Sequence, residues 1–150
     1  WVGAGYEGKV LTPNTWDAIN AVSAQLNCGG CTADTVILNC ADYYELMSSK
    51  DANGQYLMPS GWDVVNSTFN NLAILQSSEI PAGQILVYDS MELQVAVYKD
   101  ISFRQGLSTG DFESNKLSFI LEARMVVYNE RATCMVYDTI ANILQIIAKP

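Results

Sequence analysis

Apolar residues recur at helical spacing near the start of the chain. Four of them lie three or four residues apart, which is the spacing of one helix face: Trp16, Ile19, Val22 and Leu26. A polar residue and a proline precede this segment, and a pair of glycines follows it. The pattern therefore predicts one helix between a Gly-rich start of the chain and the glycines.

The next segments alternate between strand-like and helix-like character. Residues 35–38 are rich in β-branched side chains and predict a short buried strand. Asn39 is a suitable cap for a second helix over residues 41–49. Residues 50–54 end in Asn-Gly, which favours a turn, and residues 55–58 are expected to leave it in an extended form.

From residue 72 onward the pattern is mainly that of strands. The predicted strands cover residues 72–75, 85–88, 93–98 and 101–104, followed by one long stretch from 112 to 128. Residues 59–70 are expected to be irregular, with a helical turn at 62–66. Two apolar segments, 133–137 and 140–147, close the chain. This order predicts an α+β fold with two early helices and a mostly antiparallel sheet.

The charge content adds a hint of assembly. Charged residues make up 16% of the chain, against about 25% in an average soluble domain. A surface that carries so little charge is often covered in part by partners. The net charge is −8 and the eight Lys and Arg residues are scattered. This distribution disfavours specific recognition of nucleic acid, which needs a concentrated basic face.

The chain contains no His, which removes the commonest general base and the commonest neutral metal ligand. No Ser-His, Cys-His or His-metal site can therefore be built from it alone. It also shows no nucleotide-binding glycine motif and no apolar run near the ~20 residues that span a bilayer. We expect no enzyme, no cofactor and no membrane partner.

Cys28-Gly29-Gly30-Cys31 is the strongest isolated motif. Such a pair can be redox-active or can hold half a zinc site, which Cys40 and Cys134 could complete. The pair follows a helix, however, whereas a redox pair is favoured at a helix N-terminus. Ordinary loop and core thiols are the preferred interpretation; a disulfide, a metal site and a redox module stay as alternatives.

Several strings, in their order along the chain, resemble the major capsid proteins of tailed phages. The string Lys50-Asp51-Ala52-Asn53-Gly54-Gln55-Tyr56-Leu57 follows a strand, an Asn and a helix, as it often does in that family. The other matching strings are Ser78 to Gln84 before a strand that ends in Asp89, Phe112 to Leu117 running on to Glu122-Ala123-Arg124, and Val126-Val127-Tyr128 through Arg131-Ala132. Together the resemblance covers about residues 12 to 145.

The resemblance implies the Hong Kong 97-type capsid fold, and within it an axial domain plus part of a peripheral domain. The expected division is a connector at 1–11, an axial domain at 12–111, a peripheral-domain strand at 112–131 and a return to the axial domain at 132–150. The chain then looks truncated, because nothing in it matches the family's N-terminal arm, extended loop and long spine helix. The implied function is a structural subunit of a phage or prophage capsid.

The implied partners are copies of the same protein, enclosing DNA without specific recognition. The implied locations are the virion capsid and, during assembly, the host cytoplasm. A bacterial nanocompartment shell of the encapsulin type is the alternative that shares the fold, and a small Cys-x-x-Cys module is the alternative that does not. On its own the chain is expected to be monomeric or weakly associated.

The same resemblance points to contact residues between subunits. Two loops, 51–56 and 108–111, and the strand around 115–124 are the expected contact segments; the residues singled out are Asp51, Asn53, Tyr56, Asn115, Glu122 and Arg124. In some relatives an Asn at the start of this strand is crosslinked to a neighbour's Lys, with a Glu assisting. The simpler interpretation is an ion pair of Glu122 with Arg124 or Arg104.

Overall fold

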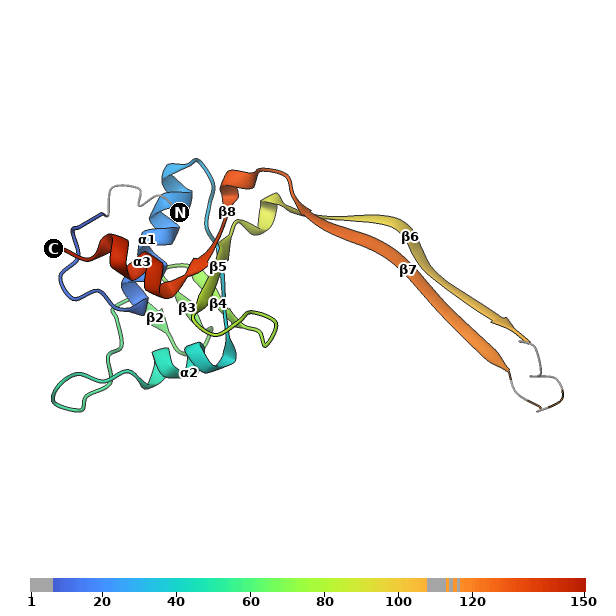
Figure 1. Ribbon diagram of the computed structural model, residues 1–150, viewed down its shortest axis with the longest axis horizontal. Coiled ribbons are helices and arrows are strands. Elements are labelled where there is room, and N and C mark those ends of the chain that lie inside the picture. The colour runs from blue at the N-terminus through green and yellow to red at the C-terminus, as the bar shows by residue number, and fades with distance from the viewer. Residues whose placement is uncertain (1–6, 108–112, 114, 116) are drawn as a thin grey trace. The chain divides into compact units, whose positions relative to one another are not determined.

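The computed structural model describes residues 7–107, 113, 115 and 117–150. The chain divides into two compact units (Figure 1). The first consists of Trp1–Glu92 together with Arg131–Pro150, and the second is Leu93–Glu130. Each unit is described by itself below.

The first unit contains a six-stranded sheet and three helices. The sheet order is β2-β3-β4-β1-β5-β8, with β1 parallel to β4 and the other neighbours antiparallel. Its strands are β1 (Thr35–Leu38), β2 (Trp62–Asp63), β3 (Thr68–Phe69), β4 (Leu72–Gln76), β5 (Gln84–Tyr88) and β8 (Met135–Thr139). Its helices are α1 (Thr15–Cys28), α2 (Cys40–Ser48) and α3 (Ile140–Ile147), with short 3-10 turns η1 (Ser90–Glu92) and η2 (Ala132–Cys134).

Helix α1 forms where the apolar spacing predicts it. A capping box holds its start: the Asp17 N–H donates to Asn14 Oδ1 at 3.1 Å, and the Asn14 N–H donates to Asp17 Oδ2 at 2.9 Å. At its end the Gly29 N–H donates to the carbonyl of Gln25 at 3.0 Å. The next glycine, Gly30, has φ +80, a left-handed value that suits the stop of a helix.

The second helix and the first strand also agree with the sequence. Asn39 caps α2, since its Oδ1 accepts from the Ala41 N–H at 2.9 Å. Its Nδ2 donates to the Ile80 carbonyl, which ties the start of α2 to the turn before β5. Strand β1 lies between β4 and β5 and is largely buried, as a β-branched run of this length predicts.

The core lies on one face of this sheet, against α1. Register places Val36 opposite Val87 and Val87 opposite Val136, so these side chains share a face, and all three are buried. Trp16 on α1 packs edge-on against Phe69, with ring centroids 4.8 Å apart. The helices α1 and α3 also contact each other. The apolar stripe of α1 is therefore the main cover of the sheet.

Two local predictions for this unit were wrong. The helical turn expected at 62–66 is instead strand β2, which pairs with β3 through Trp62 and Phe69. The helix α3 was not identified at all, although Thr139 caps it with its hydroxyl oxygen. Six of the eight residues of α3 are apolar, and a run this short and apolar fits a strand as well as a helix.

The second unit is a long antiparallel hairpin of β6 (Leu93–Gly106) and β7 (Ser118–Asn129). Residues 93–98 and 101–104, expected as two strands, belong to one strand. Register shifts between Val97 and Lys99 and between Lys99 and Ser102 mark bulges, which in the sequence resembled a connection. The hairpin therefore begins at Leu93, where the second compact unit also begins.

Phe69→Ala should lower the free energy of unfolding by about 3–5 kcal/mol, because it removes a buried ring that α1 packs against. Urea unfolding followed by Trp fluorescence would measure the change. Phe103→Ala in the hairpin is the matched control: this ring is 63% exposed, and its loss should change the value by under about 0.5 kcal/mol. Equal effects of the two changes would contradict this location of the core.

Candidate interaction surface

The β6–β7 hairpin has one apolar face along its length. Side chains directly opposite in an antiparallel pair share a face and alternate along each strand. The register pairs Val95 with Val127, Val97 with Met125 and Phe103 with Leu121. We call this side the apolar face; its apolar residues are Leu93, Val95, Val97, Phe103, Phe119, Leu121, Ala123, Met125 and Val127, and it also carries two polar residues, Asn129 opposite Leu93 and Gln105 opposite Phe119. The rings of Phe103 and Phe119 stack on it, with centroids 5.5 Å apart.

The opposite side of the hairpin, which we call the mixed face, carries its charges. There Lys99 lies opposite Arg124, and Ser102 lies opposite Glu122. The remaining pairs on this side are of mixed kinds: Gln94 with Tyr128, Arg104 with Ile120 and Gly106 with Ser118 each include a polar residue, whereas Ala96 with Val126 is an apolar pair. The two faces therefore differ in chemistry, as they do in a strand pair that is covered on one side only.

No residue of β6 or β7 is buried. Leu121 is 70% exposed and Val127 is 57% exposed, and the other large side chains of the apolar face are exposed to similar degrees, except Leu93, which is partly buried. A hairpin of two strands is a single layer with no second layer of structure to cover it, and it is only marginally stable in water by itself. A contiguous exposed apolar surface of this kind is typical of an interaction site.

Glu122 forms an ion pair on the mixed face, but with a different partner from those expected. Lys99 Nζ donates to Glu122 Oε2 in a close contact, instead of Arg124 or Arg104. The hydrogen bond and the charge of Lys99 lower the pKa of Glu122, Arg104 adds a smaller lowering effect, and desolvation opposes them. The bulges shift the register of β6, so the partner could not be counted from the sequence.

The other expected contact residues fall into two places. Asn115 is exposed and has φ +51, a left-handed conformation, in the segment before β7. Arg124 is exposed within β7. The loop at 108–111 lies outside the described residues. The structure thus places Asn115, Glu122 and Arg124 in the hairpin unit, whereas Asp51, Asn53 and Tyr56 belong to the first unit.

The loop after α2 is a tight turn that its own side chains hold. Asp51 Oδ1 accepts from the N–H groups of Asn53 and Gln55, each at 2.8 Å. A bridge pairs Lys50 with Tyr56, and the Lys50 ammonium lies 4.7 Å from the centroid of the Tyr56 ring. Asn53 and Tyr56 are exposed, so the loop presents a preformed polar and aromatic tip.

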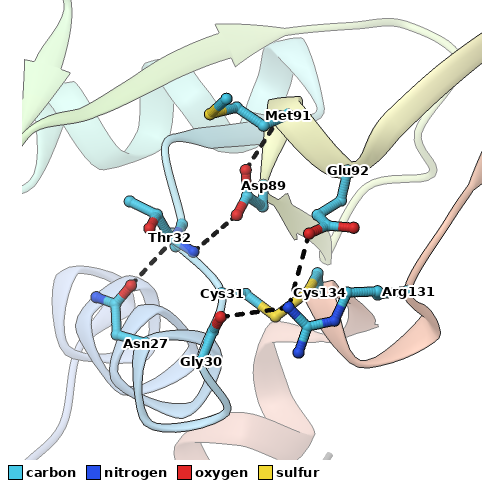
Figure 2. The surroundings of a disulfide bond; sticks show 10 residues. Asn27, Gly30, Cys31, Thr32, Asp89, Met91, Glu92, Arg131 and Cys134 are labelled. Atoms are coloured by element: carbon cyan, nitrogen blue, oxygen red, sulfur yellow. Dashed lines mark hydrogen bonds and ion pairs between the residues drawn. A yellow bond between two sulfur atoms is a disulfide. The ribbon is translucent and has the colours of Figure 1, made fainter.

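The preferred interpretation of the cysteines, as unpaired thiols, was wrong for two of them. Cys31 and Cys134 form a disulfide with a Cα–Cα distance of 5.4 Å (Figure 2). Cys28 and Cys40 are free. The bonded pair lies 103 residues apart, so only the folding of the chain brings it together, and spacing in the sequence gives no signal of it. The Cys-x-x-Cys string does not form a bond of its own.

The described residues bear on metal binding and on membrane binding through two features, the grouping of ligand side chains and the length of the helices. They contain no cluster of three or more His, Cys, Asp or Glu side chains that could hold a metal. A recess of about 290 Å³ beside α2 contains Asp42 and Glu45, but Asp42 Oδ2 is occupied as the acceptor of the Gly83 N–H at 2.6 Å. Within the described part of the chain, every helix falls short of the length and apolarity required to cross a bilayer.

Solved particle structures match this arrangement of sheet, helices and hairpin. A structure from Mycobacterium phage Adephagia has a TM-score of 0.62 at 19% identity and covers 87% of this chain and 48% of that chain. The capsid of an empty GTA particle has a TM-score of 0.61 at 17% identity and covers 89% of this chain and 45% of that chain. A virus-like particle from Pyrococcus furiosus has a TM-score of 0.56 at 15% identity and covers 89% of this chain and 56% of that chain.

The chain has the Hong Kong 97-type capsid fold. The sequence itself has no significant match among protein-family models or curated proteins. The chain spans about half the length of the capsid-fold structures that it matches. The expected fold is confirmed, and the match comes from the backbone arrangement at identities below 25%.

Among the parts of this chain that the structure describes, the hairpin should open most readily. Amide hydrogens of β6 and β7 should exchange with deuterium at least about tenfold faster than those of β1 and β5, because no buried side chain holds the hairpin closed. Hydrogen-exchange mass spectrometry of the isolated chain would measure this. Equal protection of the hairpin and the sheet would show that the hairpin is stabilised without a partner.

Lys99→Gln should raise the pKa of Glu122 to the ordinary range of a carboxyl, because the largest lowering effects come from Lys99. In the unchanged chain the ion pair contributes stability above the unfolded-state pKa and loses it as pH falls through the lower folded-state pKa. Carbon-detected NMR titration would follow the carboxyl. Asp63, whose pKa is lowered by Asn66 and by the Val65 N–H, is the internal control and should not change.

Proposed function

We propose that this chain is part of a structural subunit that self-assembles into the shell of a phage or prophage capsid. The observation that carries the proposal is the exposed apolar face of the β6–β7 hairpin, on a chain with a capsid fold. Burying that face requires another polypeptide segment, and a shell subunit meets such segments in every neighbour. The role is that of a building element without catalysis.

The two units suit the two domains of such a subunit. We propose that the first unit is the axial domain and that the hairpin belongs to the peripheral domain, with the division at Leu93 and Glu130. The sheet and its helices have a complete core of their own. The hairpin has none, so its stable form would depend on segments of the longer protein or of neighbouring subunits.

The composition supports assembly around DNA without recognition of DNA. The net charge of −8 and the low number of basic residues are compatible with a container that does not hold its contents tightly. The shell would be located in the virion, after assembly in the host cytoplasm. The chain by itself is proposed to be monomeric or weakly associated, since it spans about half the length of the matched proteins.

The nanocompartment shell stays as the alternative with the same fold, and the comparisons give it no advantage. The two roles differ in the contents of the particle. Particles purified from cells that express the complete protein would hold nuclease-protected DNA in the first case and a cargo protein in the second.

The proposal can be tested by introducing one charge on each face of the hairpin. Val127→Glu puts a carboxylate on the apolar face, where burial in an interface would leave the charge unpaired. In the complete protein it should reduce the yield of particles in sucrose-gradient sedimentation by at least about tenfold. Its isolated chain should still unfold at the same urea concentration, because Val127 is outside the core.

Val126→Glu is the matched control. Val126 is the preceding residue on the same strand, with 58% exposure against 57%, but it belongs to the mixed face beside Arg124. This change should leave most of the particle yield intact. Normal assembly of the Val127→Glu protein would overturn the role proposed for the apolar face.

A further inference from the structure

The disulfide lies where the chain leaves the first unit for the hairpin and where it returns (Figure 2). The departing segment is Asp89 followed by η1, and the returning segment is Arg131 followed by η2. The loop after α1, which contains Cys31, meets both segments. All of these residues belong to the first unit, so the disulfide ties parts of one compact body.

Asp89 contacts the backbone on both sides of the disulfide. Its Oδ2 accepts from the N–H of Thr32, the residue after Cys31, at 2.7 Å. Its own N–H donates to the carbonyl of Cys134 at 3.1 Å. The residue is 7% exposed, and its second oxygen accepts from the Met91 N–H at 3.0 Å. Two hydrogen bonds thus link Asp89 to the segments of both cysteines, and the third orients its carboxylate locally, all independently of the sulfur–sulfur bond.

Arg131 adds a second link between the same segments. Its Nη1 lies 3.6 Å from Glu92 Oε1 on the departing side. The same nitrogen donates to the carbonyl of Gly30, at 3.5 Å, in the loop before Cys31. The pairing of β5 with β8 also sets the position of η2, because Tyr88 lies opposite Met135. Non-covalent contacts therefore link the same segments as the disulfide.

We propose that folding brings the reduced Cys31 and Cys134 thiols together, that oxidation then joins them in a disulfide, and that Asp89 is the positioning residue for both. We call this pair of cysteines the latch, open when reduced and closed when bonded. In the reduced chain the two thiols lie side by side in an already folded unit. A disulfide oxidant of the glutathione class then accepts one thiolate and releases its own thiol. The second cysteine displaces a second thiol from the mixed disulfide, so two electrons and two protons pass to the oxidant.

Burial limits access to both sulfurs in both directions of the exchange. Cys31 is 5% exposed and Cys134 is fully buried, so oxidised glutathione, like a reducing thiol, reaches either sulfur only after local opening. The reduced form would persist in a reducing cytoplasm and close under oxidising conditions. If the chain is a shell subunit as proposed, the disulfide would be reduced during assembly and would form afterwards. Only this timing rests on the proposed function, because formation of the bond by the folded chain does not.

The free thiol of Cys28 competes with Cys134 as a bonding partner of Cys31. Cys28 lies three residues from Cys31, whereas Cys134 lies 103 residues away. In an unfolded chain loop closure favours the short pair by on the order of a hundredfold, although stiffness of so short a loop reduces this figure. The identity of the bond that forms therefore reports whether folding or chain proximity selects the pair.

The test is oxidation of the reduced, unmodified chain with oxidised glutathione, once in native buffer and once in concentrated urea. Trapped thiols and mapped peptides identify the bonds by mass spectrometry. Cys31–Cys134 should be the main product in native buffer, and short-range pairs that involve Cys28 should dominate in urea. The same distribution in both conditions, a failure of the reduced chain to fold, or the absence of a native bond would each overturn the latch.

The role of Asp89 is tested in a background that carries Cys28→Ser and Cys40→Ser, where no reshuffling is possible. Asp89→Asn should slow formation of the Cys31–Cys134 bond by about tenfold, since it weakens the charge-assisted hydrogen bonds that the carboxylate accepts from the N–H of Thr32, beside Cys31, and from the N–H of Met91. Asp100→Asn makes the same change of charge in the hairpin and should leave the rate unaltered.

Circular dichroism of the reduced proteins separates positioning from folding. An Asp89→Asn chain that folds and oxidises at the unmodified rate would overturn the role of Asp89. If this variant does not fold, Arg131→Gln provides a second measurement, because its side chain is 49% exposed and still links the same segments. Unchanged oxidation of that variant would overturn the non-covalent positioning as a whole.

Discussion

The constraint on which this structure depends is that two strands cannot cover their own faces. In the first unit α1 covers the sheet, with its apolar side packed on β5 and β8. The hairpin has the same kind of apolar face without such a cover. Because apolar surface in water is unfavourable by about 25 cal/mol per Å², burial of this face would favour association in the proposed shell subunit. In that proposal, stability and assembly depend on different units.

The connection between the units explains how a long insertion is tolerated. Strands β5 and β8 are antiparallel neighbours in the sheet, and the hairpin is inserted between them in sequence. The two ends of the insertion consequently lie close together, as they would for an ordinary loop between paired strands. Loop closure costs little more for a longer insertion, so the hairpin can be long without weakening the core that supports it.

The sequence predicted what local chemistry determines and missed what long-range pairing determines. The spacing of Trp16 and Ile19 and the cap at Asn39 are local signals, and they gave α1 and α2. The partner of Glu122 depends on two bulges in β6, and the disulfide depends on a contact across 103 residues. Neither has a signature in spacing. The continuity of β6 was missed because Lys99-Asp100 resembled a connection between two strands.

The position of the disulfide fits this separation of roles. The loop that it closes contains the whole hairpin, yet both of its ends are in the first unit. Closing it restricts the unfolded chain and the junction at Asp89 without touching either face of the hairpin. A shell subunit with this arrangement could strengthen its folded body after assembly while its interaction surfaces remain unchanged. Oxidation would then act on persistence of the particle and leave the selection of partners to the apolar face.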